Sequence, residues 1–129
     1  MINKVLVVDD QISAARLLVT LLQIDGYQAH HASDWCHLVD EVQAYEPDLV
    51  ILDVHLPDID GFELLRQVRA HPQAHIATVP VLVVSALDYG HRLEQSGADG
   101  FLLKPFKYEH LTEAIAKIKR ARAAAGSEV

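Results

Sequence analysis

The sequence predicts an α/β fold, a doubly wound (βα)₅ sandwich built on a five-stranded parallel sheet. Three short runs that are almost wholly apolar, at 5–8, 49–52 and 81–84, are typical of strands buried on both faces. Segments whose apolar residues recur every three or four positions, the helical spacing, separate these runs. Carboxylates follow two of the runs directly, Asp9 and Asp10 after the first and Asp53 after the second. In a sheet of this kind the ligand site lies outside the carboxyl ends of the strands.

Strands are expected at five places along the chain. The apolar runs supply strands at 5–8, 49–52 and 81–84, and weaker patterns add strands at 27–31 and 101–103. Strands that alternate with helices form a parallel sheet, and the crossovers between them are right-handed. The carboxyl ends of all five strands therefore face the same edge of the sheet.

Five helices are expected, one after each strand. Four of them show clear apolar stripes, which include Leu17 and Leu21, Leu38 and Val42, Leu65 and Val68, and Leu111 and Ile115. The first helix is stopped by Asp25-Gly26, and the third ends before Pro72. The segment 87–96 leaves room for only a short fourth helix.

Two helix ends carry more specific signals. Ser33 and Asp34 precede the second helix, and either could cap its N-terminus with a side-chain oxygen. Lys119, Arg120 and Arg122 are expected in the last turn of the fifth helix, where the helix dipole favours cations. We therefore place a single domain at residues 1–122 and regard 123–129 as a frayed tail or the start of a linker.

Composition excludes several classes of function. No apolar run approaches the roughly 20 residues that a membrane span needs, and no signal-peptide pattern follows Met1. The single cysteine, Cys36, rules out an internal disulfide and fits a cytoplasmic location. A formal net charge of -7 argues against nucleic-acid binding by this domain and suits the binding of a cation or a basic partner.

The strand ends bring charged and polar side chains to one place. Asp9 and Asp10 follow the first strand, Asp53 the third, Ser85 the fourth and Lys104 the fifth. Three carboxylates without a counterion raise one another's pKa values, and Mg²⁺, which prefers oxygen ligands, relieves this repulsion. Asp53 ends the central strand and can reach the other groups. An aspartate can act as a nucleophile toward phosphorus, and such chemistry needs charge neutralisation and positioning.

Four motifs in register resemble one known family, the receiver domains of two-component response regulators. These motifs are "VLVVDD", "DLVILDVHLPDIDGFELL", "VPVLVVSAL" and "GADGFLLKPF". They occur in order and cover residues 4 to about 120. The resemblance implies the flavodoxin-like strand order 2-1-3-4-5. It also implies a phosphorylation-activated signalling switch that accepts a phosphoryl group from a histidine kinase or a histidine phosphotransfer protein. The output would be a downstream effector protein or a covalently linked output domain.

The resemblance also assigns roles at the strand ends. Asp53 would be the phosphoacceptor, and Asp9, Asp10 and the backbone carbonyl of His55 would join it in holding Mg²⁺. Ser85 and Lys104 would hold phosphoryl oxygens. Such a domain promotes only its own phosphorylation and dephosphorylation, so it is not an enzyme in the turnover sense.

Further positions follow from the same resemblance. Phe101 matches the aromatic switch position, where a ring moves inward once the hydroxyl of Ser85 shifts toward the phosphoryl group. Lys104-Pro105 would be a cis peptide bond. Serine stands at 85 where threonine is more frequent, and the segment between the fourth and fifth strands is short. His55 is bulky and titratable, and we expect it to influence the lifetime of the acyl phosphate.

Two other functions remain open from the residues. A pseudo-receiver would have the same fold but act unphosphorylated as a protein-interaction module. A Mg²⁺-dependent phosphohydrolase would also use an aspartyl nucleophile, but it needs a second acid two residues later, where this chain has His55. A flavin or dinucleotide carrier is disfavoured because the first turn after a strand, "DDQISA", has no glycine-rich phosphate loop.

Overall fold

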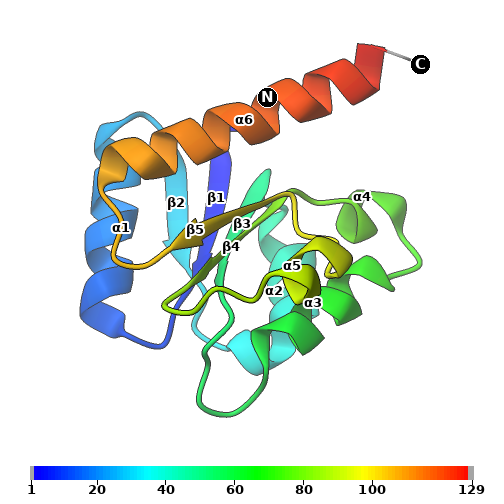
Figure 1. Ribbon diagram of the computed structural model, residues 1–129, viewed down its shortest axis with the longest axis horizontal. Helices are drawn as coiled ribbons and strands as arrows, with labels where there is room; N and C mark the ends of the chain where they lie inside the picture. The colour runs from blue at the N-terminus through cyan, green and yellow to red at the C-terminus, as the bar shows by residue number, and fades with distance from the viewer. Residues whose placement is uncertain (1, 128–129) are drawn as a thin grey trace.

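A parallel sheet of five strands forms the centre of the molecule in the computed structural model, which describes residues 2–127 (Figure 1). The strand order is β2-β1-β3-β4-β5, and every neighbouring pair is parallel. The strands are β1 (Lys4–Val8), β2 (Gln28–His31), β3 (Leu49–Asp53), β4 (Val81–Ser85) and β5 (Gly100–Leu103). The predicted fold class and strand order are confirmed, and each strand lies within one residue of its expected bounds.

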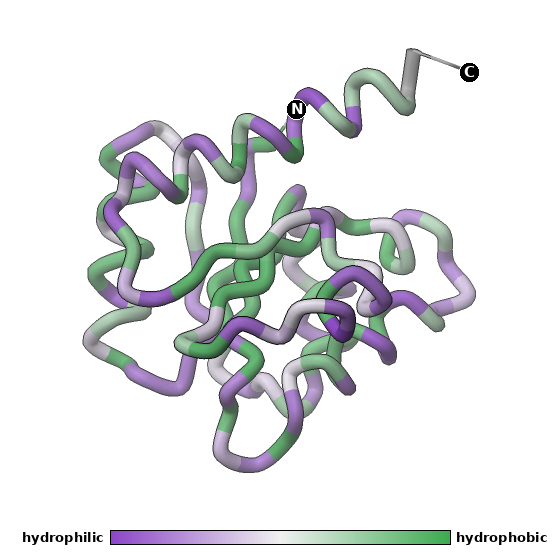
Figure 2. The backbone as a smooth tube through the Cα atoms, viewed as in Figure 1, coloured by the Kyte–Doolittle hydropathy of each residue, from purple (hydrophilic) through white to green (hydrophobic). Residues whose placement is uncertain are grey.

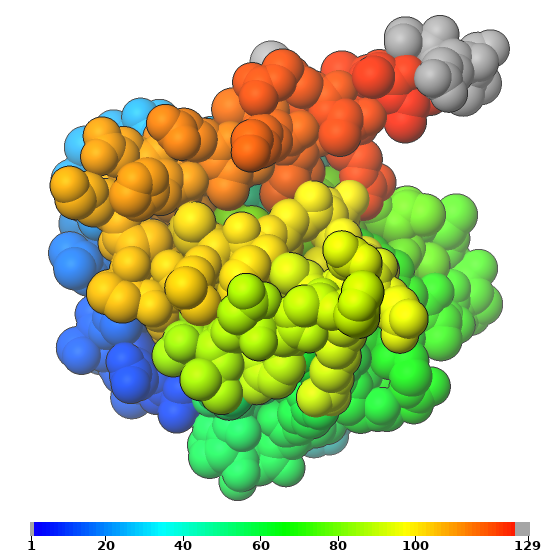
Figure 3. Space-filling view, viewed as in Figure 1, coloured from blue at the N-terminus to red at the C-terminus, as the bar shows by residue number. Residues whose placement is uncertain are grey.

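Helices cover both faces of the sheet (Figure 1). One face carries α1 (Ile12–Ile24) and α6 (Tyr108–Ser127), and α2 (Leu38–Tyr45) and α3 (Gly61–Arg69) lie on the other. The short helices α4 (Ala74–Ala77) and α5 (His91–Gln95) also pack on the α2/α3 side. The space-filling view shows α6 running along one edge, with its C-terminal part extending past the rest of the molecule (Figure 3).

The central strands are apolar because they are buried on both faces. Leu6 and Val8 of β1 point into the core under α2 and α3, whereas Val5 and Val7 point into the core under α1 and α6. Each such side chain contributes roughly 1.5–3 kcal/mol when it leaves water. Figure 2 shows the result as a continuous hydrophobic centre, with hydrophilic residues concentrated on the outer helices and loops.

The helices differ from the sequence-based expectations in three places. Trp35–His37 forms a 3₁₀ turn, and α2 begins only at Leu38. Neither Ser33 nor Asp34 caps it, because the carboxylate of Asp34 binds Nδ1 of His37 and the hydroxyl of Ser33 binds Glu41. The four-residue helix α4 was not expected. Such a short segment carries too few residues to show a helical period.

The last helix is longer than its apolar stripe suggests. It runs to Ser127, so Lys119, Arg120 and Arg122 do not lie in its last turn, and our expectation for them was wrong. Residues 123–127 continue the helix, whereas 128–129 lie outside the described residues. The division into a domain at 1–122 and a tail or linker at 123–129 stays a prediction. None of the described helices combines the length and the hydropathy that a membrane crossing requires.

Candidate functional site

Three carboxylates meet at the carboxyl edge of the sheet. Val8 of β1 pairs with Leu52 of β3, so the residues that follow them, Asp9 and Asp53, lie side by side. One carboxylate oxygen from each of Asp9, Asp10 and Asp53 lies within 4.8 Å of the others. Asp9 and Asp53 are buried, and Asp10 is partly exposed. The structure thus places the three predicted acids in one cluster that opens to solvent at Asp10.

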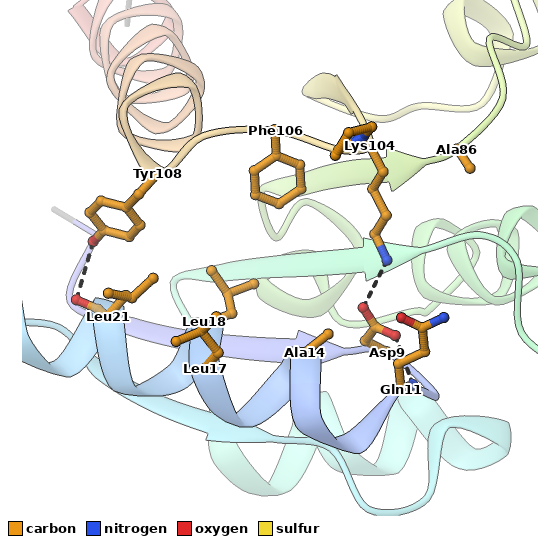
Figure 4. Close-up of a pocket in the computed structure, with 11 residues that line it drawn as sticks. Asp9, Gln11, Ala14, Leu17, Leu18, Leu21, Ala86, Lys104, Phe106 and Tyr108 are labelled. Carbon is orange, nitrogen blue, oxygen red and sulfur yellow. Dashed lines mark hydrogen bonds and ion pairs between the residues drawn. The ribbon is translucent and has the colours of Figure 1, made fainter.

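Lys104 enters this acidic cluster from the far strand of the sheet. It follows β5, and its Nζ lies 2.8 Å from Oδ2 of Asp53 and 2.9 Å from Oδ2 of Asp9. Figure 4 shows the side chain reaching across to Asp9. Burial on its own lowers the pKa of Lys104, but the hydrogen bonds and charges of Asp53 and Asp9 outweigh burial and raise it. The ammonium group is therefore charged and holds the two carboxylates together.

The other oxygens of the buried pair are bound by backbone amides. Oδ1 of Asp9 accepts a hydrogen bond from the amide of Gln11 at 2.9 Å, and Oδ1 of Asp53 accepts one from the amide of His55 at 2.8 Å. Within residues 2–127, the carboxylate of Asp10 makes no hydrogen bond or ion pair. Asp10 is thus the acid whose oxygens are free for a ligand.

The donor set fits a hard divalent cation. Its protein atoms are carboxylate oxygens, and no cysteine or histidine belongs to the cluster. Mg²⁺ is commonly bound through one or two carboxylates together with waters and phosphate oxygens. Asp10, with Asp9 and Asp53 beside it, could hold such an ion. The expected contribution of the His55 carbonyl stays a prediction.

Ser85 ends β4, the strand next to Asp53 and β3, and Phe101 lies on β5, one strand further along the sheet. Ser85 is fully buried, and its Oγ accepts a hydrogen bond from the amide of Leu87 at 3.0 Å, which leaves the hydroxyl hydrogen for donation. Phe101 pairs with Val83 in the register of β4 and β5, and its ring is half-buried against the α2/α3-side core. Its switch role stays a prediction. The Lys104-Pro105 peptide bond is cis, as the resemblance implied.

The start of α3 lies directly against the end of β3. Gly61 donates its amide to the carbonyl of Val54 at 3.1 Å, and a Cβ at this position would lie 3.0 Å from the carbonyl oxygen of Asp53. Only glycine permits this approach. Asp60 caps the helix by accepting a hydrogen bond from the amide of Phe62. The close packing holds the loop after β3 tightly beside the acidic cluster.

A set of five side chains, which we call the two-loop clamp, joins the loop after β3 to the segment after β4. Its members are His55, Asp60, Phe62, Tyr89 and Arg92. The hydroxyl of Tyr89 lies 2.7 Å from Nε2 of His55, and its ring meets Phe62 edge-on at 5.0 Å. Arg92 forms an ion pair with Asp60 and lies over the ring of Phe62 at 4.4 Å. Sequence reasoning missed this clamp, because no local pattern connects positions some thirty residues apart.

An apolar groove of about 480 Å³ leads away from the acidic cluster along α1 (Figure 4). Asp9 and Lys104 lie at its polar end. Leu17, Leu18 and Leu21 of α1 form one wall, and Phe106 and Tyr108 face them from the segment that leads into α6. The stripe on α1 is therefore only partly covered. Leu17 retains 62% of its exposure.

Comparisons with known proteins agree with this geometry. The family model described as "Response regulator receiver domain" matches residues 5–116. Among solved structures, the chemotaxis protein CheY4 of Vibrio cholerae superposes with a TM-score of 0.82 at 30% identity, covering 92% of this chain and 99% of that one. The signal receiver domain of a putative Luxo repressor protein from Vibrio parahaemolyticus gives 0.80 at 28% identity, covering 100% and 99%.

Curated relatives are regulators. The transcriptional regulatory protein YxdJ of Bacillus subtilis is 35% identical over 121 residues, which is 91% of this chain and 49% of that protein. The regulatory protein VanRc of Enterococcus gallinarum is 36% identical over 120 residues, 92% of this chain and 49% of that one. The chain thus spans about half the length of these two regulators.

Proposed function

Because the chain belongs to the receiver domains of two-component response regulators, we propose that it is a phosphorylation-activated switch whose acceptor is Asp53. The phosphoryl group would come from a phosphohistidine on a sensor kinase or on a phosphotransfer protein. The reaction would require Mg²⁺, and the domain would promote only its own phosphorylation and dephosphorylation. The changed surface would then bind an effector protein or a linked output domain.

One observation carries this proposal: Lys104 bridges Asp53 and Asp9 while the carboxylate of Asp10 stays free beside them. A purely structural ion pair needs two charges, and this cluster has three acids for one lysine. Burial of unbalanced charge costs free energy unless a ligand compensates it. The surplus negative charge suits a cation, and the lysine suits the phosphoryl group that the cation would accompany.

The transfer is a displacement at phosphorus. A carboxylate oxygen of Asp53 forms the new O–P bond as the N–P bond of the phosphohistidine breaks, and the electron pair of that bond stays on the imidazole nitrogen, which takes up a proton. Lys104 holds a phosphoryl oxygen once it leaves the carboxylate pair, and the free hydroxyl hydrogen of Ser85 binds another. A bound Mg²⁺ supplies neutralisation of the charge on the transferred group.

Phosphorylation changes the charge at this edge of the sheet. The acyl phosphate adds roughly -1.5 to -2 charges at neutral pH. A bias of about 1–3 kcal/mol between two states is enough for a switch. The two relatives named as regulatory proteins are about twice as long as this chain, so a linked output domain is one candidate for the target of this signal. We also place the protein in the cytoplasm, where the free thiol of Cys36 would stay reduced.

The proposal is tested with small phosphodonors and Mg²⁺. Acetyl phosphate or phosphoramidate should add one phosphoryl group to the intact protein, read by mass spectrometry, and EDTA should prevent it. Asp53→Asn should abolish the addition. Asp58→Asn is the matched control, because Asp58 is an exposed acid in the same loop and lies outside the acidic cluster. It should be phosphorylated like the wild type.

Two outcomes would favour the alternative functions. If neither donor phosphorylates the wild type in Mg²⁺, the switch is wrong and the pseudo-receiver replaces it. If the protein releases phosphate from small phosphomonoesters over many turnovers, the phosphohydrolase replaces it. The side chain two residues after Asp53 is His55, which hydrogen-bonds to Tyr89. The position therefore lacks the second acid that such hydrolases use on the leaving group.

A further inference from the structure

His31 touches the acidic cluster from a strand that contributes no acid to it. It is the last residue of β2, and its Nε2 lies 2.8 Å from the backbone carbonyl oxygen of Asp9. A carbonyl oxygen can only accept, so Nε2 donates this hydrogen bond. The side chain is half-buried. Its neighbour His30 lies on the opposite face of the strand, where it stacks on Tyr45 at 5.3 Å and does not contact Asp9.

The bond lies where the backbone ladder between β1 and β2 stops. The register of the two strands ends with Val7 opposite His31, and the amide of Ala32 makes the last ladder bond, to the carbonyl of Val7. Asp9 lies beyond this point. The side chain of His31 therefore adds one more hydrogen bond between the two segments, beyond the end of the backbone ladder. Its acceptor is the carbonyl of the peptide that joins Asp9 to Asp10.

The Asp9–Asp10 peptide sets the direction of Asp10. The carboxylate of Asp9 is held by the amide of Gln11 and by Lys104, but within residues 2–127 the carboxylate of Asp10 has no such partner. Its position therefore depends on the backbone that carries it. Rotation of the Asp9–Asp10 peptide would break the bond to His31 and turn the carboxylate of Asp10 away from Asp53. Partners that orient a ligand in this way commonly change metal affinity when they are removed.

We propose that His31 is a positioning residue for the cation site, and that it acts by fixing the Asp9–Asp10 peptide so that the carboxylate of Asp10 faces Asp53. This role rests on the proposed function, in which the acidic cluster holds Mg²⁺. It makes the edge strand β2 part of the site, although β2 supplies none of its ligands.

The test measures Mg²⁺ binding by calorimetry on the unphosphorylated protein. His31→Ala should weaken binding roughly tenfold or more. His31→Gln should recover most of the affinity, because its carboxamide can donate to the same carbonyl. His30→Ala is the matched control from the next position and should bind Mg²⁺ like the wild type. Melting temperatures in EDTA show that each variant is folded.

A second pair of variants separates positioning from general loosening of the fold. In an Asp10→Asn background, His31→Ala should cause little further loss of affinity, because the side chain through which His31 acts is already changed. Three results would overturn the role of His31 even if the wild type bound Mg²⁺. His31→Ala could bind Mg²⁺ as tightly as the wild type, or His31→Ala and His31→Gln could lose the same amount of affinity. The third such result is that the losses from His31→Ala and Asp10→Asn add fully in the double variant. A wild type that binds no Mg²⁺ would overturn the cation site itself, and with it the role of His31.

Discussion

The hydroxyl of Tyr89 lies 2.7 Å from Nε2 of His55, so one hydrogen bond joins the loop after β3 to the segment before α5. The Phe62–Tyr89 contact and the Arg92–Asp60 ion pair connect the same two segments. Ser85, the proposed phosphoryl ligand, is only four residues before Tyr89. If the segment after β4 shifts and moves Ser85 toward a phosphoryl group, the contacts of the two-loop clamp therefore have to move with it or break.

Tyr89→Phe removes the hydroxyl and keeps the ring. We expect the free energy of unfolding to fall by about 0.5–1 kcal/mol, since one hydrogen bond between partly exposed groups is lost. The freed imidazole of His55 should also leave the acyl phosphate more open to water and shorten its lifetime. Urea unfolding and the decay of the phosphorylated protein measure the two effects.

Two controls belong to this experiment. Tyr45→Phe removes a hydroxyl for which no hydrogen bond is found within residues 2–127, so it should change the lifetime of the acyl phosphate little. A double-mutant cycle with His55→Ala isolates the pair. A coupling energy near zero would show that the bond contributes nothing in solution.

Lys104→Ala should separate cation binding from phosphoryl transfer. The ammonium group occupies one oxygen of Asp9 and one of Asp53, so its removal leaves a more negative site. We expect Mg²⁺ to bind at least as tightly as in the wild type, whereas phosphorylation by acetyl phosphate should slow by roughly a hundredfold. Calorimetry and the time course of phosphoryl incorporation test this.

Lys107 provides the matched control for that variant. It is an exposed lysine three residues further along the same segment and makes no side-chain contact with the acidic cluster. Lys107→Ala should leave both quantities unchanged. If Lys104→Ala lowered the Mg²⁺ affinity and the rate of phosphorylation by the same factor, the role of Lys104 as a phosphoryl ligand would be wrong.

Asp99→Asn should destabilise the edge of the sheet opposite the acidic cluster. Asp99 binds Arg69 and Arg122 and also accepts a hydrogen bond from the amide of Val81. Burial lowers the pKa of Arg69, and the charge of Asp99 opposes this effect. Loss of the carboxylate charge leaves a half-buried guanidinium uncompensated, so we expect a loss of about 2–3 kcal/mol in unfolding free energy. Glu63→Gln alters an exposed ion pair and should leave the urea midpoint unchanged.

Through Tyr108, we expect the free energy of unfolding to depend on pH in the alkaline range. Burial, followed by the hydrogen bond and charge of Asp25, raises the pKa of Tyr108 from 10.0 to about 12. The folded state therefore holds this proton more tightly than the unfolded state. The stabilisation that results is complete below the unfolded pKa and is lost as the pH rises from 10.0 toward about 12.

The comparison of the wild type with Tyr108→Phe tests this sign. The wild type should be the more stable protein at about pH 9, and its advantage should shrink toward about pH 11. Urea unfolding at several pH values gives the difference directly. An advantage that stays constant over this range would show that Tyr108 is not coupled to folding through its proton.

Some of the site was predictable because its parts are local in sequence. The apolar runs that end at Asp9-Asp10, Asp53 and Ser85 predict both the strands and the edge where they end, and the "LLKPF" stretch adds Lys104. The cis bond at Pro105 and the short α5 were also anticipated. The second helix was less predictable. Ser33 and Asp34 look like caps, but their side chains bind the side chains of Glu41 and His37 and not the free backbone amides at the start of α2.

Local patterns in the sequence are enough to specify a parallel α/β sheet with acids, a hydroxyl and a lysine at one edge. Strand periodicity and the handedness of crossovers suffice for that, because both act through neighbouring residues. The contacts of His31 with the carbonyl of Asp9 and of Tyr89 with His55 follow from no such pattern and are visible only in the folded molecule. Such contacts depend on the angles at which separate elements pack. Those angles come from the volume of the whole core rather than from any local pattern.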